Sequence, residues 1–279
     1  MYNYGVIVPA YNPDINLIIL IKNLLQIEIA FLVVVNDGSK ESSREIFEEI
    51  KQYGPRVISL EHSINLGKGA ALKTGLNYAY AHFPEDIGVV TADADGQHSI
   101  ADIIRVGEAL KNKPKDLIIG VRQFKSTADK PVPWRSRFGN LLTIKLFKLI
   151  VGQSISDTQS GLRGIPRAYI PDLLRINNNG YEFELNMLIS CKYTNRKISE
   201  VSIDTIYIDN NKSSHFNPIL DSLKIYFVLL RFALLSFSTF LLDLTVFVTL
   251  SHLGFNILSC QLLSRTVGAL YNYPLAKNM

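Results

Sequence analysis

The sequence predicts an α/β fold with a mostly parallel sheet, followed by a helical hairpin that is apolar enough to cross a membrane. Three observations predict this fold. Short β-branched runs alternate with longer amphipathic stretches as far as about residue 120. Polar motifs stand at the ends of three of these runs, which is where parallel sheets bind ligands. The C-terminal stretch is far more apolar than the rest of the chain.

Five short runs are predicted to form strands, and four longer stretches are predicted to form helices. The strand ranges are Gly5–Pro9, Phe31–Asn36, Arg56–Leu60, Gly88–Thr91 and Leu117–Gly120. The helix ranges are Ile15–Leu25, Ser42–Tyr53, Gly69–Ala81 and Ile100–Leu110. Ser99, followed by Asp102, is typical of a helix N-cap. Because strands and helices alternate, we expect a largely parallel sheet with helices on both faces.

Three polar motifs are predicted to meet at one edge of this sheet. Tyr11-Asn12 follows the first strand, Asn36-Asp37-Gly38-Ser39 the second, and Asp93–His98 the fourth. The carboxyl ends of parallel strands lie at the same edge, so these segments are expected to form one site. Taken alone, Asn36–Gly38 is more typical of a turn, because Asp-Gly favours positive φ.

The residues Asp93, Asp95 and Gln97 alternate at the end of the fourth strand, so their oxygens can point to one side. Such ligands suit Mg²⁺ or Mn²⁺, which bind through one or two carboxylates together with substrate phosphates. The segment therefore predicts a divalent metal site that holds a diphosphate. An acidic turn without a ligand is the alternative.

A glycine-rich segment, Asn65-Leu66-Gly67-Lys68-Gly69, lies just before a predicted helix. Its glycines would let backbone N–H groups approach a phosphate, and Lys68 would add positive charge. The spacing is not that of a P-loop, Gly-x-x-x-x-Gly-Lys-Ser/Thr. An ordinary loop before a helix N-terminus is the alternative.

Composition excludes several classes of function. The net charge of +4 is too small to argue for nucleic-acid binding, and no RNA-binding aromatic motif is present. Cys191 and Cys260 form neither a metal-binding spacing nor a disulfide framework, which fits a reducing compartment. The first residues run into an apolar strand without a signal peptide, so we expect the front of the protein to be cytosolic.

Together these motifs resemble family 2 glycosyltransferases, and most closely the branch of dolichol-phosphate mannose synthase and bacterial polyprenyl-phosphate glucosyltransferases. The resemblance covers about residues 4 to 230. Its ordered segments are Val8–Asn12, Val35–Ser39, Asn65–Ala71, Asp93–His98, Gly120–Arg122, Ser156–Gly164 and Tyr181–Glu184. In one departure, many relatives carry Glu after Tyr-Asn, where this chain has Pro13-Asp14.

The resemblance implies a GT-A fold that binds a nucleotide-diphospho-sugar. It implies that Asp37 contacts the base or ribose, and that Mg²⁺ or Mn²⁺ is held by Asp93, Asp95 and Gln97. The implied nucleotide-sugar site consists of Pro9, Tyr11, Asn12, Asp37, Gly67, Lys68, Asp93, Ala94 and Asp95. Processive relatives carry Gln-x-x-Arg-Trp, whereas Gln159 here is followed by Ser160–Gly164, so transfer of a single sugar is favoured.

The acceptor decides what catalysis requires. A sugar hydroxyl needs a general base, whereas a phosphate monoester has a second pKa of about 6 and is mostly a dianion at neutral pH. A phosphate acceptor instead needs cations, and guanidinium groups suit its oxygens. The candidates are Asp157, Arg122 and Arg163 for catalysis, and Arg122, Arg135 and Arg137 for the acceptor phosphate. A loop carboxylate held by local N–H groups and solvated surface arginines are the alternatives.

Two regions of the chain suit contact with a lipid bilayer. Residues 133–150 place Trp, Arg and Lys beside an apolar face, which is typical of a membrane interface or, alternatively, of a core helix. Phe232–Leu250 carries Asp243 as its single charge and is long enough to span the hydrocarbon core. Ile257–Leu275 could return across the membrane, with Arg265 compensating Asp243.

The predicted organisation is a cytosolic domain over residues 1–215, an interfacial helix over 216–231 and a transmembrane hairpin over 232–279. Lys and Arg flank the hairpin, so the positive-inside rule predicts a multi-pass protein of the cytoplasmic membrane with its catalytic domain in the cytoplasm. The hairpin also resembles the first half of the four-helix GtrA-like family, which would continue with two more helices. An anchor is the favoured interpretation.

The sequence favours a metal-dependent inverting hexosyltransferase that moves one sugar from a nucleotide-diphospho-sugar to polyprenyl (undecaprenyl) phosphate. Transfer to a saccharide hydroxyl is the second hypothesis. A nucleotide-binding scaffold or translocation partner without catalysis is the third. The resemblance makes a homo-oligomer plausible, whereas neither the nucleotide nor the sugar follows from the sequence.

Overall fold

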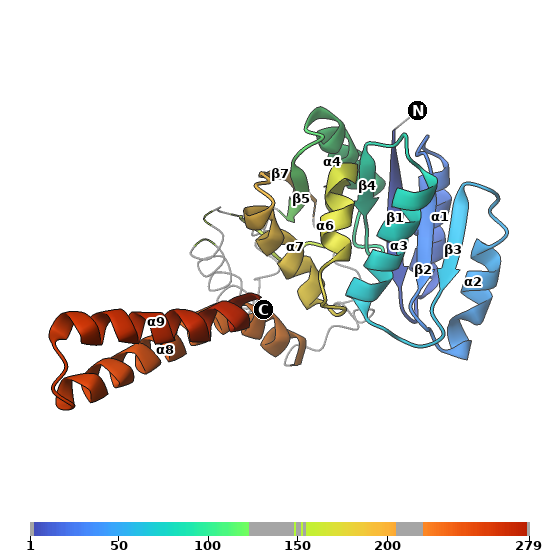
Figure 1. The fold of residues 1–279 in the computed structure, drawn as a ribbon. Helices are drawn as coiled ribbons and strands as arrows, with labels where there is room; N and C mark the ends of the chain where they lie inside the picture. Colours follow the sequence, from blue (N-terminus) through green and yellow to red (C-terminus); the bar gives the residue numbers. More distant parts are fainter. Residues whose placement is uncertain (1–2, 123–147, 149–151, 153–154, 205–219, 278–279) are drawn as a thin grey trace, which may run out of the picture. The chain divides into compact units, whose positions relative to one another are not determined.

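The computed structural model describes residues 3–122, 148, 152, 155–204 and 220–277 (Figure 1). The chain divides into two compact units, Met1–Asp221 (unit 1) and Ser222–Met279 (unit 2). Unit 1 contains a sheet covered by helices, and unit 2 consists of helical chain.

Within the described part of unit 1, seven strands form one sheet in the order β3-β2-β1-β4-β6-β5-β7. The strands are β1 (Tyr4–Ala10), β2 (Leu32–Asn36), β3 (Val57–Glu61), β4 (Gly88–Thr91), β5 (Leu117–Arg122), β6 (Arg163–Pro166) and β7 (Ile198–Ile203). All neighbours pair in parallel except that β6 runs antiparallel to β4 and β5. The predicted strands are confirmed, with ends that differ by at most two residues, whereas β6 and β7 were not predicted.

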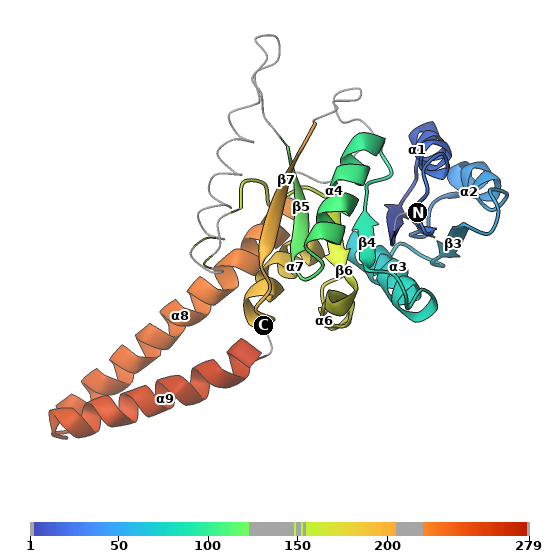
Figure 2. The ribbon, with the colours of Figure 1, turned by 90° about the horizontal axis from the view of Figure 1, so that it is seen from above.

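Helices cover both faces of the sheet (Figure 2): α1, α2 and α4 lie on one face, and α3, α6 and α7 lie on the other. Their bounds are α1 (Ile15–Leu25), α2 (Arg44–Ile50), α3 (Lys68–His82), α4 (Ile100–Asn112), α6 (Ile170–Leu174) and α7 (Glu182–Tyr193), with short 3-10 helices η1 (Glu41–Ser43) and η2 (Arg167–Tyr169). The predicted helix over Ser42–Tyr53 is wrong in its bounds, because η1 and the shorter α2 replace it.

Local sequence explains how these elements begin and where the core lies. The predicted cap of α4 is confirmed, since Ser99 Oγ accepts from the Asp102 backbone N–H at 3.1 Å. The near-continuous apolar runs of β1 and β2 suit strands that are buried on both faces, and every residue of these two strands is buried. Apolar side chains from α1 and α4 then pack on one face to form the main core. This burial holds the strand ends that carry the polar motifs in fixed positions.

The reversed direction of β6 shapes the ligand edge of the sheet. Arg163, the first residue of β6, pairs with Thr91, the last residue of β4. The segment that precedes β6 therefore arrives at the carboxyl end of β4. Thr91 Oγ1 donates to the Gly161 carbonyl at 2.7 Å, which fixes this approach.

Unit 2 contains α8 (Leu220–His252) from Ser222 onward and α9 (Ile257–Lys277), joined by a short turn. Polar contacts join the two helices: Asn272 Nδ2 donates to Thr239 Oγ1 at 2.9 Å. The predicted approach of Arg265 to Asp243 is confirmed, with Nε and Oδ2 3.7 Å apart. Large apolar side chains are exposed on the outside, among them Leu234, Phe237, Phe240, Leu258, Leu262 and Leu270.

One helical segment in the described ranges, Ala233–His252, is long and apolar enough to cross a membrane. The return segment, α9, is a helix as predicted but does not reach that standard. Residues 220–231, within the predicted interfacial helix over 216–231, are helical and form the start of α8, which runs without a break from Leu220 to His252.

Candidate active site

The first two predicted motifs are in contact at the ends of β1 and β2. Asn12 adopts a φ of +46°, which is uncommon outside glycine. Its backbone N–H donates to Ser39 Oγ at 2.9 Å, and its side-chain oxygen accepts from the Lys40 N–H at 2.8 Å. Tyr11 precedes it, and Pro9 is buried in β1 beside β2. The two strand ends are therefore tied together before any ligand binds.

Asp37 joins the end of β2 to the glycine-rich loop. Its carboxylate is almost fully buried and accepts from the Leu66 N–H at 2.9 Å and the Gly67 N–H at 2.8 Å. His62 Nδ1 lies 2.7 Å from Asp37 Oδ1, and His62 Nε2 lies 2.9 Å from Thr74 Oγ1 of α3. Asp37 thus holds the glycine-rich loop in place, and His62 links Asp37 to α3.

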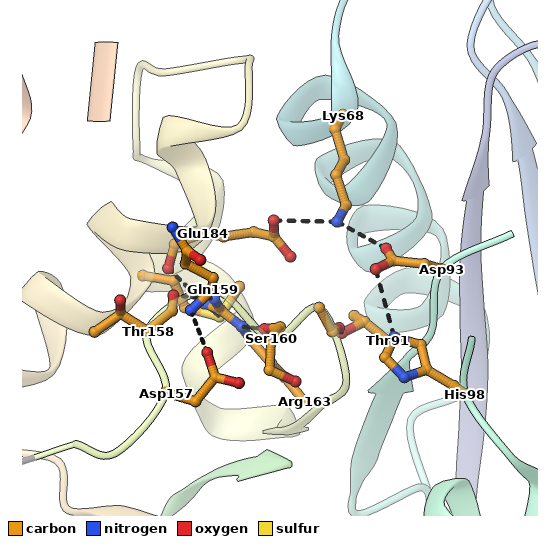
Figure 3. A network of polar contacts seen from close by, with 12 residues as sticks. Lys68, Thr91, Asp93, His98, Asp157, Thr158, Gln159, Ser160, Arg163 and Glu184 are labelled. Carbon is orange, nitrogen blue, oxygen red and sulfur yellow. Dashed lines mark hydrogen bonds and ion pairs between the residues drawn. The ribbon is translucent and has the colours of Figure 1, made fainter. Parts of the chain in front are cut away.

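Lys68, the first residue of α3, bridges two carboxylates (Figure 3). Its Nζ lies 2.7 Å from Asp93 Oδ1 and 3.1 Å from Glu184 Oε2. Burial alone would lower the pKa of Lys68, but the two carboxylates outweigh it and raise that pKa above its usual value. The preceding Gly67 has φ +100°, and a Cβ there would lie 2.5 Å from the Asn179 carbonyl oxygen. Glycine is therefore required where the loop meets the chain before α7.

The Asp93–His98 segment turns sharply after β4. Burial would raise the pKa of Asp93, but Lys68 and His98 lower it below its usual value. The pKa of Asp95 is raised, first by burial and then by the negative charge of Asp93. Asp95 Oδ1 accepts from the Gln97 N–H at 3.0 Å. Ala94, between the two carboxylates, packs on the core.

The donor set of this segment fits a divalent ion that is shared with a substrate. Within the described ranges, no group of three or more His, Cys, Asp or Glu side chains is placed to hold a metal. Asp93, Asp95 and the Gln97 amide offer instead two carboxylates and one neutral oxygen. Mg²⁺ and Mn²⁺ accept such partial sets when substrate phosphates complete the shell. The raised pKa of Asp95 also fits, because a cation would relieve its repulsion from Asp93.

Asp157 and Arg122 form a bidentate pair in which the carboxylate is buried and the guanidinium is partly exposed. Arg122 Nε and Nη2 donate to the Asp157 carboxylate at 2.7 Å and 3.1 Å, and the Gln159 N–H donates to it at 2.9 Å. The Asp157 side chain is 0% exposed, whereas that of Arg122 is 29% exposed. Burial would raise the pKa of Asp157, but the hydrogen bonds from Arg122 lower it below its usual value.

Arg163 is buried beneath the loop that precedes β6. The residue is 1% exposed, and its guanidinium donates to the carbonyls of Ser160 at 2.9 Å, Glu184 at 2.5 Å and Thr158 at 3.4 Å. It therefore holds the loop against α7, and its guanidinium does not face solvent. Arg135 and Arg137 lie outside the described residues. Asp14 caps α1 by accepting from the Asn16 N–H at 2.9 Å.

Several residues of the site were not assigned a role from the sequence. Glu184 is the last residue of the motif Tyr181–Glu184, and His98 is the last residue of the motif Asp93–His98. Their place in these motifs was the only sequence feature that pointed to a role for them. Gly161 passes so close to Asp93 that a Cβ would lie 2.5 Å from Oδ2. His62 carried no signal at all, because a lone histidine after a strand is not distinctive.

Comparison with known proteins agrees with this geometry. The chain matches Glycosyl transferase family 2 over residues 5–174. It is 31% identical over 237 residues to a UDP-N-acetylglucosamine–dolichyl-phosphate N-acetylglucosaminyltransferase of Methanococcus voltae, covering 80% of this chain and 93% of the relative. It is 32% identical over 179 residues to an undecaprenyl-phosphate 4-deoxy-4-formamido-L-arabinose transferase of Edwardsiella ictaluri, covering 61% of this chain and 51% of the relative.

A solved structure shares the fold. It is the glucosyl-3-phosphoglycerate synthase of Mycobacterium tuberculosis in complex with Mn²⁺, UDP and glucosyl-3-phosphoglycerate. The TM-score is 0.56 at 21% identity, and the match covers 82% of this chain and 78% of the other. This likeness confirms the predicted GT-A-type α/β fold. The ordered motifs, the mostly parallel sheet and the similarity over most of the chain lead to one conclusion: this protein belongs to glycosyl transferase family 2.

Proposed function

We propose that this protein transfers a single hexose, with inversion, from a nucleotide-diphospho-sugar to polyprenyl phosphate. The observation that carries the proposal is the state of Asp157, which is fully buried, paired with Arg122 through two hydrogen bonds and lowered in pKa. A carboxylate held in this way is a weak proton acceptor. A phosphate acceptor needs no such base, because it is already mostly a dianion at neutral pH.

We assign the donor to the edge formed by β1, β2 and β4. Asp37 and the loop it holds would bind the base or ribose, with Pro9, Tyr11 and Asn12 beside them. Gly67 and Lys68 would face the diphosphate from the N-terminus of α3, where the helix dipole favours an anion. Asp93, Asp95 and Gln97 would hold Mg²⁺ or Mn²⁺, an ion that neutralises the charge of a departing nucleoside diphosphate.

We assign the acceptor phosphate to the side of the site that carries Arg122. Asp157 fixes the plane of the Arg122 guanidinium, so this group would meet the phosphate without a loss of rotamer freedom. Arg135 and Arg137 stay candidates for the same phosphate. For Arg163 the buried geometry supports a positioning role, in which it holds the loop that carries Asp157.

We also propose that unit 2 anchors the protein in the cytoplasmic membrane as a two-pass hairpin. Its polar contacts lie between the helices and its large apolar side chains lie outside, the reverse of a soluble helix pair. The domain over residues 1–215 would then face the cytoplasm, near the lipid acceptor.

The decisive experiment is sugar transfer to undecaprenyl phosphate in detergent. UDP- and GDP-sugars would be offered one at a time with Mn²⁺ or Mg²⁺, with Asp95→Ala as the control. We expect labelled lipid from one donor, lost on chelation and in the variant. Donor consumption only with a saccharide acceptor would replace the proposal with hydroxyl transfer. Nucleotide binding without any turnover would favour a scaffold.

A further inference from the structure

The ammonium of Lys68 contacts two segments of unit 1 that are far apart in the sequence. Asp93 follows β4, whereas Glu184 lies in the first turn of α7 (Figure 3). The side chains of Lys68 and Glu184 are only 18% and 11% exposed, so water screens their interaction weakly. Glu184 thus holds the ammonium of Lys68, the group that we assign to the donor diphosphate.

The charges around Lys68 are unbalanced. One ammonium faces the carboxylates of Asp93 and Glu184, and the charge of Asp95 also interacts with it. His98 contacts Asp93 at 3.4 Å and is a further nitrogen at this cluster. Among the described residues, a diphosphate that approaches this cluster meets more carboxylates than ammonium groups. A divalent cation would reverse that balance.

We propose that Glu184 is a positioning residue that acts through Lys68 and makes binding of the donor diphosphate depend on the metal. This inference rests on the proposed function, because it assumes a diphosphate at Lys68. Glu184 keeps the ammonium on Asp93 and offsets its charge, so that Lys68 attracts a nucleotide only weakly when no metal is bound. The same offset reduces the repulsion between the ammonium and a metal cation, so nucleotide and metal bind together rather than separately.

The test is direct binding to the full-length protein in detergent, with Glu184→Gln as the variant. The amide keeps the shape of the side chain, and the Glu184 carbonyl that accepts from Arg163 is unchanged. Calorimetry would measure UDP and GDP in the presence of EDTA, and Mn²⁺ without nucleotide. We expect the metal-free nucleotide to bind roughly three- to tenfold tighter and Mn²⁺ to bind weaker by a similar factor, since one nearby charge is removed.

A matched control is Glu182→Gln, two residues earlier in the same first turn of α7. Glu182 accepts from the Gly180 N–H at 3.1 Å, and none of its described contacts is with Lys68. We expect neither affinity to shift in this variant. In Lys68→Met the added Glu184→Gln change should have a smaller effect on nucleotide binding, because Glu184 acts through the lysine.

The two dissociation constants distinguish the outcomes. Opposite shifts in Glu184→Gln support the inference, whether or not a lipid product forms. Shifts in the same direction, no shift, or equal shifts in Glu182→Gln would overturn it. A wild-type protein that binds neither nucleotide with Mn²⁺ would overturn both this inference and the proposed donor class. Normal binding without lipid product would affect the proposed acceptor alone.

Discussion

Two buried carboxylates of the site, Asp37 and Asp157, show how partners decide the role of a residue. Asp37 is held by two backbone N–H groups and His62, which leaves it as a fixed acceptor at the end of β2. Asp157 is held by Arg122, which keeps it ionised. The same residue type thus orders a loop in one place and orients a guanidinium in the other.

The pH profile of transfer tests the assignment of Asp157. Its pKa lies below the usual range, so it stays ionised as the pH falls through 6, while the acceptor phosphate takes up its second proton at about pH 6. We expect kcat/KM for the lipid phosphate to fall below that pH. Asp157→Asn should reduce kcat/KM roughly 100-fold by releasing Arg122, yet leave the midpoint unchanged. A midpoint that moves in the variant would identify Asp157 as the titrating base.

Paired substitutions of His62 test its link to Asp37. Asparagine can place an N–H near the Nδ1 position and keep the bond to Asp37, whereas glutamine reaches the Nε2 position and keeps the bond to Thr74. We expect His62→Gln to raise the KM for the donor about tenfold, with a smaller effect on kcat, because the buried Asp37 loses a partner. His62→Asn should be close to wild type in steady-state kinetics. Equal losses in both variants would indicate a general packing role.

At this scale the sequence predicted which residue types gather at the strand ends, but not which of them pair. Position along the chain is enough to bring Asp37 and Asp93 to one edge, since parallel strands end together. The bridge from Lys68 to Glu184 depends on the packing of α3 beside α7, which no local pattern encodes. The buried position of Arg163 likewise depends on α7.

At the scale of elements, the strands with strong β-branched patterns were predictable and β6 was not. Arg163–Pro166 is short, ends in proline and pairs with strands far away in the sequence. Its pairing is non-local, so periodicity carries little signal for it. Yet β6 decides the site, because its reversed direction brings Gly161 against Asp93. The predicted second helix is too long at its C-terminal end, because the amphipathic pattern continues to Tyr53 whereas α2 ends at Ile50. Gly54, with φ +88°, follows soon after.

The contact between the loop before β6 and Asp93 can be tested with Gly161→Ala. A Cβ there would lie 2.5 Å from Asp93 Oδ2, so the carboxylate or the loop must move. We expect Mn²⁺-dependent donor binding to weaken at least about tenfold, as misplacement at a site costs affinity steeply. Calorimetry of donor nucleotide with Mn²⁺ is the measurement.

The neighbouring Ser160→Ala is the control for Gly161→Ala. Within the described residues the buried Ser160 Oγ has no hydrogen-bond partner, so its removal should leave both binding and the melting temperature nearly unchanged. Wild-type affinity in Gly161→Ala would show that the close approach is not needed for binding.

For the whole molecule, hydropathy predicted the apolar segment Ala233–His252, because the ability to cross a membrane depends on length and composition, which are local. The expected two-pass topology can be measured with single introduced cysteines at Leu253, in the turn, and Lys277, the last residue of α9. Both native cysteines are buried, so the background is low. A membrane-impermeant maleimide added to spheroplasts should label Leu253→Cys, whereas Lys277→Cys should react only after lysis. Labelling of both positions from outside would show that α9 does not return.

The order of the strands in the sheet also has a consequence for synthesis. When the ribosome has released β1 to β4, each of these strands already has a neighbour to pair with. Among the described strands, β5 pairs with β6 and β7 only, so it waits until Arg163 and the residues beyond it have been made. Because chains fold from the N-terminus as they emerge, we expect the donor half of the site to be organised first. The half that carries Asp157 follows later.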